Sequence, residues 1–329
     1  MLRESILPVS LFECDTRWLS GLSCEFAPIA LLVFFCLLSS FESWKPAKKT
    51  SLKHLSLSYK TNIALFVFNS VILSVLSASS LFVLAEKYSG SGLLRHVSNP
   101  VAQIILAFLL LDLLLYLWHK ACHSFDCFWM FHRIHHNDRA LNSSTAFRVH
   151  ILEILITTLL KAFYIVALGV STAITLGVEI IITFFVLFHH SNISFKGEKF
   201  LGYVIIVPSL HRVHHSPERQ EHDSNYGAVL SIWDRLFGTL TELEPEKAGI
   251  KGRTPQDLIN LIKFGFSVEP PALVTTTNPP VPMETMIAEA AYYKAEKRCF
   301  KPGYELYDWL EAKKEIIQLV YGNNFSRPV

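Results

Sequence analysis

The chain has 329 residues, 51% of them hydrophobic, and its formal net charge at pH 7 is only +2. This length allows one or two domains, and so high an apolar content predicts membrane-spanning helices. A nearly neutral chain without a dense basic run is a poor candidate for binding nucleic acid. The six cysteines show no CxxC spacing, which argues against a zinc ribbon.

Three apolar segments in the first part of the chain predict membrane spans, at about 26–41, 61–85 and 101–118. The loop 45–60 between the first two carries several lysines. Positive loops stay in the cytoplasm, so this loop is predicted to be cytoplasmic and the N-terminus to lie outside. The third span then emerges on the cytoplasmic side, where His119 follows it.

A second apolar block covers about 149–188, with Gly169 near its middle. Each half is long enough to cross a bilayer, so the block predicts a transmembrane helical hairpin. Lys161 and Glu179 lie at similar distances on either side of the tip, hence at similar depth. Because a lone charge inside a membrane is costly, we expect the two side chains to face each other or a shared polar interior.

Most of the fourteen histidines gather in four motifs, HxxxH, HRIHH, HHSN and HRVHH, at residues 119–123, 132–136, 189–192 and 211–215. Residues four apart on a helix point in nearly the same direction. Imidazole is the usual ligand of iron, copper and zinc at neutral pH. Eight or more imidazoles exceed the needs of one ion, so the motifs predict two metals. Both the spans and the hairpin bring these motifs to one membrane face.

The same region resembles the fatty acid hydroxylase family, often called the sterol desaturase family. The resemblance covers roughly residues 100–240. The motifs that carry it are DLLLYLWHKACH at 112–123, HRIHH at 132–136, FRVHILE at 147–153, HSN at 190–192, PSLHRVHH at 208–215, DSNYG at 223–227 and WDRLFGT at 233–239.

In that family the histidines hold two metal ions, understood as a di-iron centre. The acidic residue of the family's RxHPxE motif usually follows a proline, and Ile151 stands in that place here. Asp112, Tyr116, Glu153 and Asn192 are candidates for orienting the imidazoles or a bound water. The resemblance implies these metal ligands: His119, His123, His132, His135, His136, His190, His211, His214 and His215.

The resemblance further implies hydroxylation or desaturation of a lipid C–H bond with dioxygen, a reaction that needs a metal centre because no side chain supplies such an oxidant. The chain shows no GxGxxG, CxxCH or iron–sulfur spacing. A separate electron donor of ferredoxin or cytochrome type is therefore expected. The motifs leave open which lipid is the substrate; a sterol, a fatty acyl chain, a carotenoid, an ether lipid and an aminolipid all suit such a site.

Two other functions remain as alternatives. A zinc-dependent membrane hydrolase would also use histidines, but neither histidine box contains the glutamate of an HExxH motif. A non-catalytic membrane binding module would keep the fold without the chemistry, and the intact histidine set argues against it.

The tail from residue 287 to 316 resembles a short bacterial helical domain of unknown function, which implies a bacterial inner-membrane protein. The expected fold class is all-α integral membrane, with about three spans plus a transmembrane helical hairpin and a cytoplasmic histidine-rich helical cap. A helix is expected at about 254–264, with Thr254 as its N-cap. The predicted regions are 1–100 (interfacial segment and two spans), 101–245 (fatty acid hydroxylase-like di-metal domain), 246–283 (cytoplasmic helix and Pro-rich linker) and 284–329 (helical tail).

Overall fold

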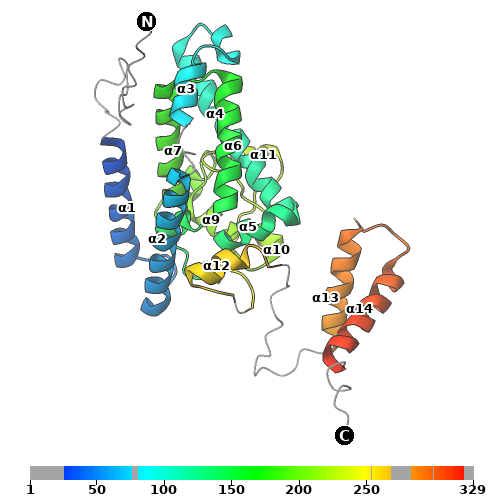
Figure 1. Cartoon of the computed structure of the whole chain (residues 1–329). Coiled ribbons are helices and arrows are strands. Elements are labelled where there is room, and N and C mark those ends of the chain that lie inside the picture. The colour runs from blue at the N-terminus through cyan, green and yellow to red at the C-terminus, as the bar shows by residue number, and fades with distance from the viewer. Residues whose placement is uncertain (1–25, 76–80, 253, 268–282, 299, 322–329) are drawn as a thin grey trace, which may run out of the picture. The chain divides into compact units, whose positions relative to one another are not determined.

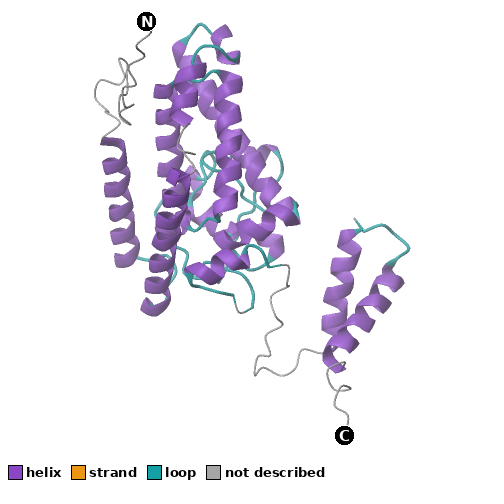
Figure 2. Cartoon of the chain, viewed as in Figure 1, coloured by secondary structure: helices purple, strands orange, loops and turns teal. Residues whose placement is uncertain are grey.

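The computed structural model describes residues 26–75, 81–252, 254–267, 283–298 and 300–321. These residues form helices joined by loops (Figure 2). Their one extended pairing is a single antiparallel β-bridge between Ile205 and Leu230. The all-α class expected from the sequence is confirmed.

Four helices among the described residues are long and apolar enough to cross a membrane. In their most apolar windows only 17% to 28% of the residues are buried within the protein. Apolar surface of this extent is unfavourable in water and favourable in lipid. The chain is therefore an integral membrane protein, as predicted. The four helices are α1 (Phe26–Trp44), α4 (Pro100–Ser124), α6 (Ile151–Leu168) and α7 (Thr172–His190).

The predicted second span falls on α2 (Leu52–Val75) and α3 (Leu81–Tyr88). Residues 76–80 lie outside the described residues, so a continuous span over 61–85 stays a prediction. Neither α2 nor α3 is among the four candidate spans.

The polar side chains of α2 explain its lower hydropathy. The side chains of Asn62 and Asn69 are buried against the rest of the protein rather than exposed to lipid. The Asn62 amide donates to Asp138 Oδ2 at 2.9 Å, and the Asn69 amide donates to the carbonyl of Val149 at 2.8 Å. α2 therefore serves partly as a polar support for the segments that carry the histidines.

Helices α6 and α7 form the predicted hairpin. Gly169 ends α6 with φ +68°, a left-handed conformation that glycine adopts at little cost. A Cβ at Gly92 would lie 2.2 Å from the Gly169 nitrogen, so the chain before η1 (Leu93–His96) approaches the hairpin tip too closely for any side chain. Lys161 Nζ lies 2.7 Å from Glu179 Oε2, which confirms that the two charges of the hairpin face each other.

The remaining elements of this part of the chain form a cap. Helices α5, α9 and α12 gather at one end of the long helices, whereas α3 lies at the other end (Figure 1). The cap contains segments that precede the α6–α7 hairpin in the sequence and segments that follow it. Its elements are α5 (Asp126–His136), η2 (Ser143–Phe147), α8 (Glu198–Leu201), α9 (Pro208–His214), α10 (Arg219–His222), α11 (Ile232–Leu236) and α12 (Leu258–Phe264).

The prediction that a helix begins at Thr254 was wrong. Helix α12 begins at Leu258, and its N-cap is Asp257, whose carboxylate accepts the backbone N–H of Asn260 at 3.1 Å. The Thr254 hydroxyl instead donates to the side chain of Asn137, which follows α5. This contact holds the chain before α12 against the end of α5, so the helix starts one turn later than its sequence suggests.

The C-terminal part separates from the rest as a second compact unit, which begins at Ala272. It contains α13 (Met283–Lys297) and α14 (Glu305–Tyr321), in agreement with the helical tail expected from the sequence. Their shared core consists of Ile287, Ala291, Ala312 and Ile316. Most of the predicted Pro-rich linker lies outside the described residues.

Candidate metal centre

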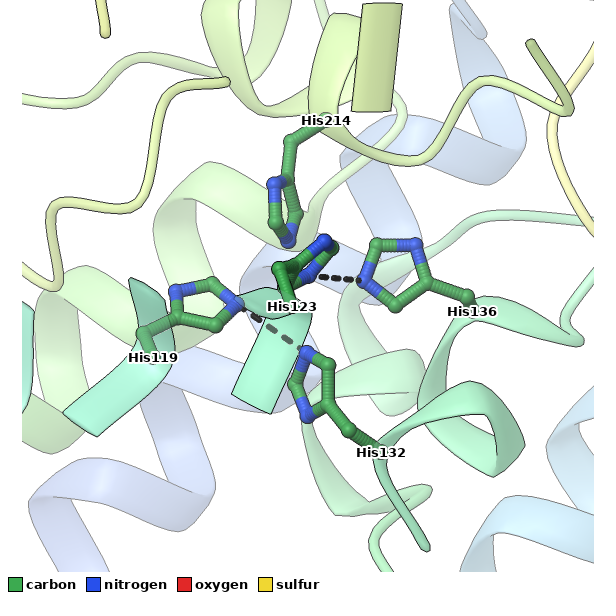
Figure 3. Close-up of side chains that lie close together, drawn as sticks. All are labelled: His119, His123, His132, His136 and His214. Carbon is green, nitrogen blue, oxygen red and sulfur yellow. Dashed lines mark hydrogen bonds between the residues drawn. The ribbon is translucent and has the colours of Figure 1, made fainter. Parts of the chain in front are cut away.

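The histidines that the sequence marks as ligands come together in two clusters. In each cluster, one ring nitrogen from every histidine lies within 4.8 Å of the others. All of them are buried except His119, which is half-buried. The first cluster, drawn in Figure 3, consists of His119 and His123 of α4, His132 and His136 of α5, and His214 of α9. The second consists of His135 of α5, His190 of α7, His211 of α9, and His215 at the C-cap of α9.

The HxxHH spacing explains why the clusters are adjacent. On a helix, residues i and i+4 point about 40° apart, whereas residue i+3 points about 60° to the other side of residue i. Helix α5 places His132 and His136 in the first cluster and His135 in the second. The motif of α9 does the reverse, because only its middle histidine, His214, joins the first cluster. Each motif therefore contributes to both clusters.

In the first cluster the Nε2 atoms point toward one another. His119 Nε2 lies 3.1 Å from His132 Nε2, and His123 Nε2 lies 3.1 Å from His136 Nε2 (Figure 3). His214 Nε2 is buried without a hydrogen-bond partner, and its ring points toward the other four. Helices from distant parts of the chain thus direct their ligand nitrogens into one space.

The second cluster repeats this arrangement. His190 Nε2 lies 3.0 Å from His135 Nε2 and 2.9 Å from His211 Nε2. His215 Nε2 lies 3.1 Å from His211 Nε2. Nitrogens that share one ion at about 2.1 Å, at right angles, lie roughly 3 Å apart, so these separations suit metal ligation.

Backbone carbonyls hold the outer nitrogens of four of these histidines. A carbonyl oxygen only accepts hydrogen bonds, so each of these rings carries its proton on Nδ1 and leaves Nε2 as a bare acceptor. The pairs are His119 Nδ1 with Tyr226 (2.8 Å), His135 Nδ1 with Arg148 (3.3 Å), His190 Nδ1 with Val186 (2.7 Å) and His214 Nδ1 with Ser224 (2.7 Å).

Carboxylates hold two further rings, and both belong to the first cluster. His132 Nδ1 lies 2.8 Å from Glu153 Oε1, and His123 Nδ1 lies 3.0 Å from Asp223 Oδ1. A carboxylate in this position fixes the tautomer and increases the basicity of the inner nitrogen. Both contacts again leave Nε2 free to donate its lone pair into the cluster.

This assignment of protons tests whether the clusters suit a metal. In the second cluster, the inner nitrogens of His135 and His190 both carry lone pairs, yet they lie 3.0 Å apart. In the first cluster the same holds for His119 and His132 at 3.1 Å. Two lone pairs at this distance repel each other unless a positive charge lies between them. A metal ion in each cluster satisfies these nitrogens and the orphaned His214 Nε2 together.

Burial keeps the imidazoles neutral, which is the form that binds metals. Burial lowers the pKa of His132 to about 3, and that of His135 to about 3 as well. The pKa of His136 is also well below its usual value, first through burial and then through the neighbouring histidines. The donor set is therefore entirely nitrogen and uncharged at pH 7.

Asp112 supports the first cluster through the loop that contains Tyr226. Its buried carboxylate accepts the backbone N–H groups of Val229 (2.9 Å) and Leu230 (3.1 Å) and the indole N–H of Trp233 (2.8 Å). It therefore fixes the loop that follows Tyr226, whose carbonyl holds His119.

Tyr116 lies in the same region and is fully buried. Its hydroxyl lies 2.9 Å from Thr239 Oγ1, and its ring is T-shaped against Tyr226 at 6.2 Å between centroids. Tyr116 thus packs against Tyr226, whose ring in turn contacts His119, His123 and His214 of the first cluster.

Glu153 and Asn192 have different surroundings. Glu153 contacts an imidazole directly, through His132, and its second oxygen is buried without a hydrogen-bond partner. The Asn192 side chain instead accepts the backbone N–H of Lys48 and donates to its carbonyl, at 2.9 and 2.8 Å. Asn192 thereby fastens the loop after α1 to the end of α7.

Some contacts to the clusters were not predicted from the sequence. Asp223, which holds His123, was quoted only as part of the DSNYG motif, although an acidic residue soon after a histidine box was a usable signal. His222 stacks on Trp129 with ring centroids 5.3 Å apart, and Trp129 packs against His123 at 5.0 Å. His189 is buried with its ring centroid 4.0 Å from that of His211, outside the two ligand clusters.

Comparison with known proteins agrees with this geometry. The family model described as fatty acid hydroxylase matches residues 104–239. An ornithine lipid hydroxylase of Rhizobium tropici is 31% identical over 43% of this chain and 42% of its own length. The alkylglycerol monooxygenase of Homo sapiens is 34% identical over 49% of this chain and 35% of its own length. The matches thus span less than half the length of these relatives.

Two further comparisons concern the tail and the fold. A family model described as a protein of unknown function matches residues 282–317, which is the α13–α14 hairpin. No solved structure matches the chain.

Proposed function

We propose, from the premise that residues 104–239 belong to the fatty acid hydroxylase family, that this chain is a membrane-bound di-iron oxygenase acting on a lipid C–H bond. The observation that carries the proposal is the pair of adjacent histidine clusters, in which protonated outer nitrogens leave inner lone pairs facing each other at about 3 Å. Such an arrangement is unfavourable without cations and well suited to two of them.

Iron is the metal that fits the proposed reaction. Imidazole ligands suit iron, copper and zinc alike, but zinc has no redox chemistry. When bound, two ferrous ions supply the electrons and the Lewis acidity by which dioxygen becomes an oxidant of C–H bonds. The overall balance for hydroxylation is R–H + O₂ + 2 e⁻ + 2 H⁺ → R–OH + H₂O. Two electrons and two protons must therefore reach the site in each turnover.

The chain's residues have three tasks in this proposal. The nine clustered histidines hold the ions through Nε2. Backbone carbonyls and the carboxylates of Glu153 and Asp223 fix the ring orientations, so that little reorganisation is needed when metal binds. The tightly packed cap excludes bulk water, which protects a reactive centre from side reactions.

The substrate in this proposal is a polar lipid that enters from the bilayer. The clusters lie at the ends of the apolar helices α4 and α7, so a lipid tail beside these helices has its reactive carbon near the histidine level. The names of two relatives give an ornithine lipid and an alkylglycerol as their substrates. Both are polar lipids, and we propose this class here.

The proposal places the histidine cap on the cytoplasmic face of a bacterial inner membrane, since the lysine-rich loop after α1 favours that side. On this face the electrons come from a separate donor of ferredoxin or cytochrome type. Asp223 is partly exposed and contacts His123 of the first cluster, so we propose that the donor approaches this part of the cap.

The test is the metal content of the purified protein beside that of a His135→Ala, His214→Ala double variant. About two irons per chain in the wild type after ferrous reconstitution, and a large loss in the variant, are expected because each substitution removes a ligand from one cluster. His54→Ala serves as a matched control, since His54 is exposed on α2. Absence of bound metal after reconstitution contradicts the proposal.

The reaction is tested separately, by comparing lipids from cells with and without the gene under ¹⁸O₂. One labelled oxygen in a new hydroxylipid is the expected result. An unlabelled product with a new double bond identifies desaturation instead, and an unchanged lipid profile in cells with metal-loaded protein contradicts the lipid substrate.

A further inference from the structure

Helix α14 of the C-terminal hairpin presents an apolar stripe on its outer side. Leu306, Leu310 and Ile317 are 72%, 55% and 39% exposed, although all three are large aliphatic side chains. At 100° per residue they lie within about 40° of one another. The same stripe lies about 140° around the helix from Ala312, which faces α13. α14 is therefore apolar on two sides, and α13 covers only one of them.

Lysines border this stripe on both sides. Lys313 lies about 20° to one side of Leu306, and Lys314 about 40° to the other side of Leu310. Together with Leu310 and Ile317 they line a shallow groove along the helix. A narrow aliphatic stripe between two cationic side chains is the pattern of a helix that lies in the interface of a membrane, where lysine stems cover apolar surface and ammonium groups reach the phosphates.

The outer side of α13 has the opposite character. Glu289 and Tyr292 are exposed there, roughly opposite the positions of Ile287 and Ala291 that face α14. The side of α14 turned away from α13 is thus aliphatic and basic, and the side of α13 turned away from α14 is acidic and aromatic. This asymmetry orients the hairpin toward an anionic surface, because turning it over brings Glu289 to the phosphates.

A bilayer is also the surface that the chain always has within reach. Residues 268–282 connect the hairpin to the membrane-bound part of the chain and extend over at most roughly 50 Å. Being tethered gives the hairpin a high effective concentration at that bilayer, so even a weakly apolar stripe binds. A second copy of the chain suits the stripe less well, since three aliphatic side chains are far short of the roughly 800 Å² per partner of a stable dimer.

We propose that the α13–α14 hairpin docks through α14 onto the anionic phospholipid surface of the same membrane that holds α1, α4, α6 and α7. Leu306, Leu310 and Ile317 insert at the level of the head groups, and Lys313 and Lys314 pair with lipid phosphates. This inference needs only the membrane location of the chain and does not depend on the metal chemistry.

The experiment uses the full-length protein in nanodiscs of phosphatidylcholine alone or with added phosphatidylglycerol. Hydroxyl-radical labelling with mass spectrometry reports the solvent accessibility of each side chain. We expect labelling of Leu306 and Leu310 to fall by about threefold or more in the anionic discs, because lysines close to an anionic lipid surface are attracted to it. Labelling of Tyr292 on α13 changes little.

A charge-matched pair of variants isolates the basic borders. Lys313→Glu, Lys314→Glu removes the protection in anionic discs, whereas Lys297→Glu, Lys301→Glu makes the same charge change on exposed lysines of the hairpin and leaves the protection in place. Equal labelling of Leu310 in the two disc types overturns the proposal. Protection that persists in the Lys313→Glu, Lys314→Glu variant and increases with protein concentration also overturns it, and identifies self-association instead.

Discussion

The two histidine clusters differ in what holds their rings. In the first cluster, two of the five histidines have a carboxylate on the outer nitrogen, Glu153 or Asp223. In the second cluster, the outer nitrogens of His135 and His190 contact neutral carbonyls, and those of His211 and His215 are buried without a hydrogen-bond partner. A carboxylate partner adds negative charge next to a bound cation, so the first cluster is suited to bind its ion more tightly.

The clusters also differ in how they reach solvent. Asp223 is 34% exposed and contacts His123 of the first cluster directly. The second cluster has no such exposed partner among the described residues, and its histidines are all buried. Two sites built from the same repeated motif are therefore unequal in their access to solvent. We expect the first cluster to load its metal first and to exchange it with the outside.

The largest effect is expected when a single ligand is removed from either cluster. His136→Ala deletes a ligand of the first cluster only, and His215→Ala deletes one of the second only. We expect each variant to keep about one metal per chain, because a cluster with one ligand fewer binds its ion far more weakly. Metal analysis of the two purified proteins, side by side, measures this.

Loss of both metals in either variant contradicts two separable sites and indicates one cooperative centre. His96→Ala, which changes an exposed histidine at the end of η1, controls for the effect of removing an imidazole.

The carboxylates of the first cluster have the next largest effect. Glu153→Gln keeps the shape of the side chain but removes its charge next to His132. We expect the affinity of the first cluster for metal to fall by about 10- to 100-fold, with no change in the second cluster. Titration with ferrous iron, in a His215→Ala background that isolates the first cluster, gives the affinity directly. An unchanged affinity shows that the carboxylate only supports packing.

Much of this centre could be predicted from the spacing of its histidines. The i, i+4 repeat is a property of helix geometry, so the grouping of His119 with His123, or of His132 with His136, follows from the sequence. The division into two clusters could not be predicted, because it depends on how α5 and α9 face each other across the cap.

The supporting contacts were harder to predict for a different reason. Four outer nitrogens bind backbone carbonyls, and a carbonyl is present at every residue, so no side chain marks those positions. Asn192 sits next to the histidines in sequence, yet its side chain binds the backbone of Lys48. By contrast, the pairing of Lys161 with Glu179 could be predicted, because apolar surroundings leave a charge few partners.

A substitution at Arg148 is expected to affect metal binding in the second cluster and not in the first. Its carbonyl accepts His135 Nδ1, and its buried guanidinium donates to the carbonyl of Ile134, to Asn62 and to Gln256. It therefore positions His135 from both sides. We expect Arg148→Lys to weaken metal binding in the second cluster by about tenfold and to spare the first, because a lysine cannot make these divergent contacts.

The measurement is again a titration with ferrous iron, now in a His136→Ala background that isolates the second cluster. Asn69→Ala is the matched control. It also removes a buried hydrogen bond, from Asn69 of α2 to the carbonyl of Val149, but this bond does not involve His135. Equal weakening by both substitutions points to general loosening of the cap rather than to positioning of His135.

The smallest effect on metal binding is expected from the Lys161–Glu179 ion pair of the α6–α7 hairpin. This ion pair is expected to stabilise the membrane-spanning helices without affecting the clusters. Glu179→Leu leaves Lys161 unpaired in an apolar environment, and we expect the free energy of unfolding to fall by about 2 kcal/mol. Lys161→Met together with Glu179→Leu removes both charges and restores most of that loss. Unfolding in detergent measures stability, and the metal content of both variants is expected to match the wild type. A fall in metal content without a fall in stability contradicts the separation of the hairpin from the clusters, because it shows that the ion pair positions the end of α7 and with it His190.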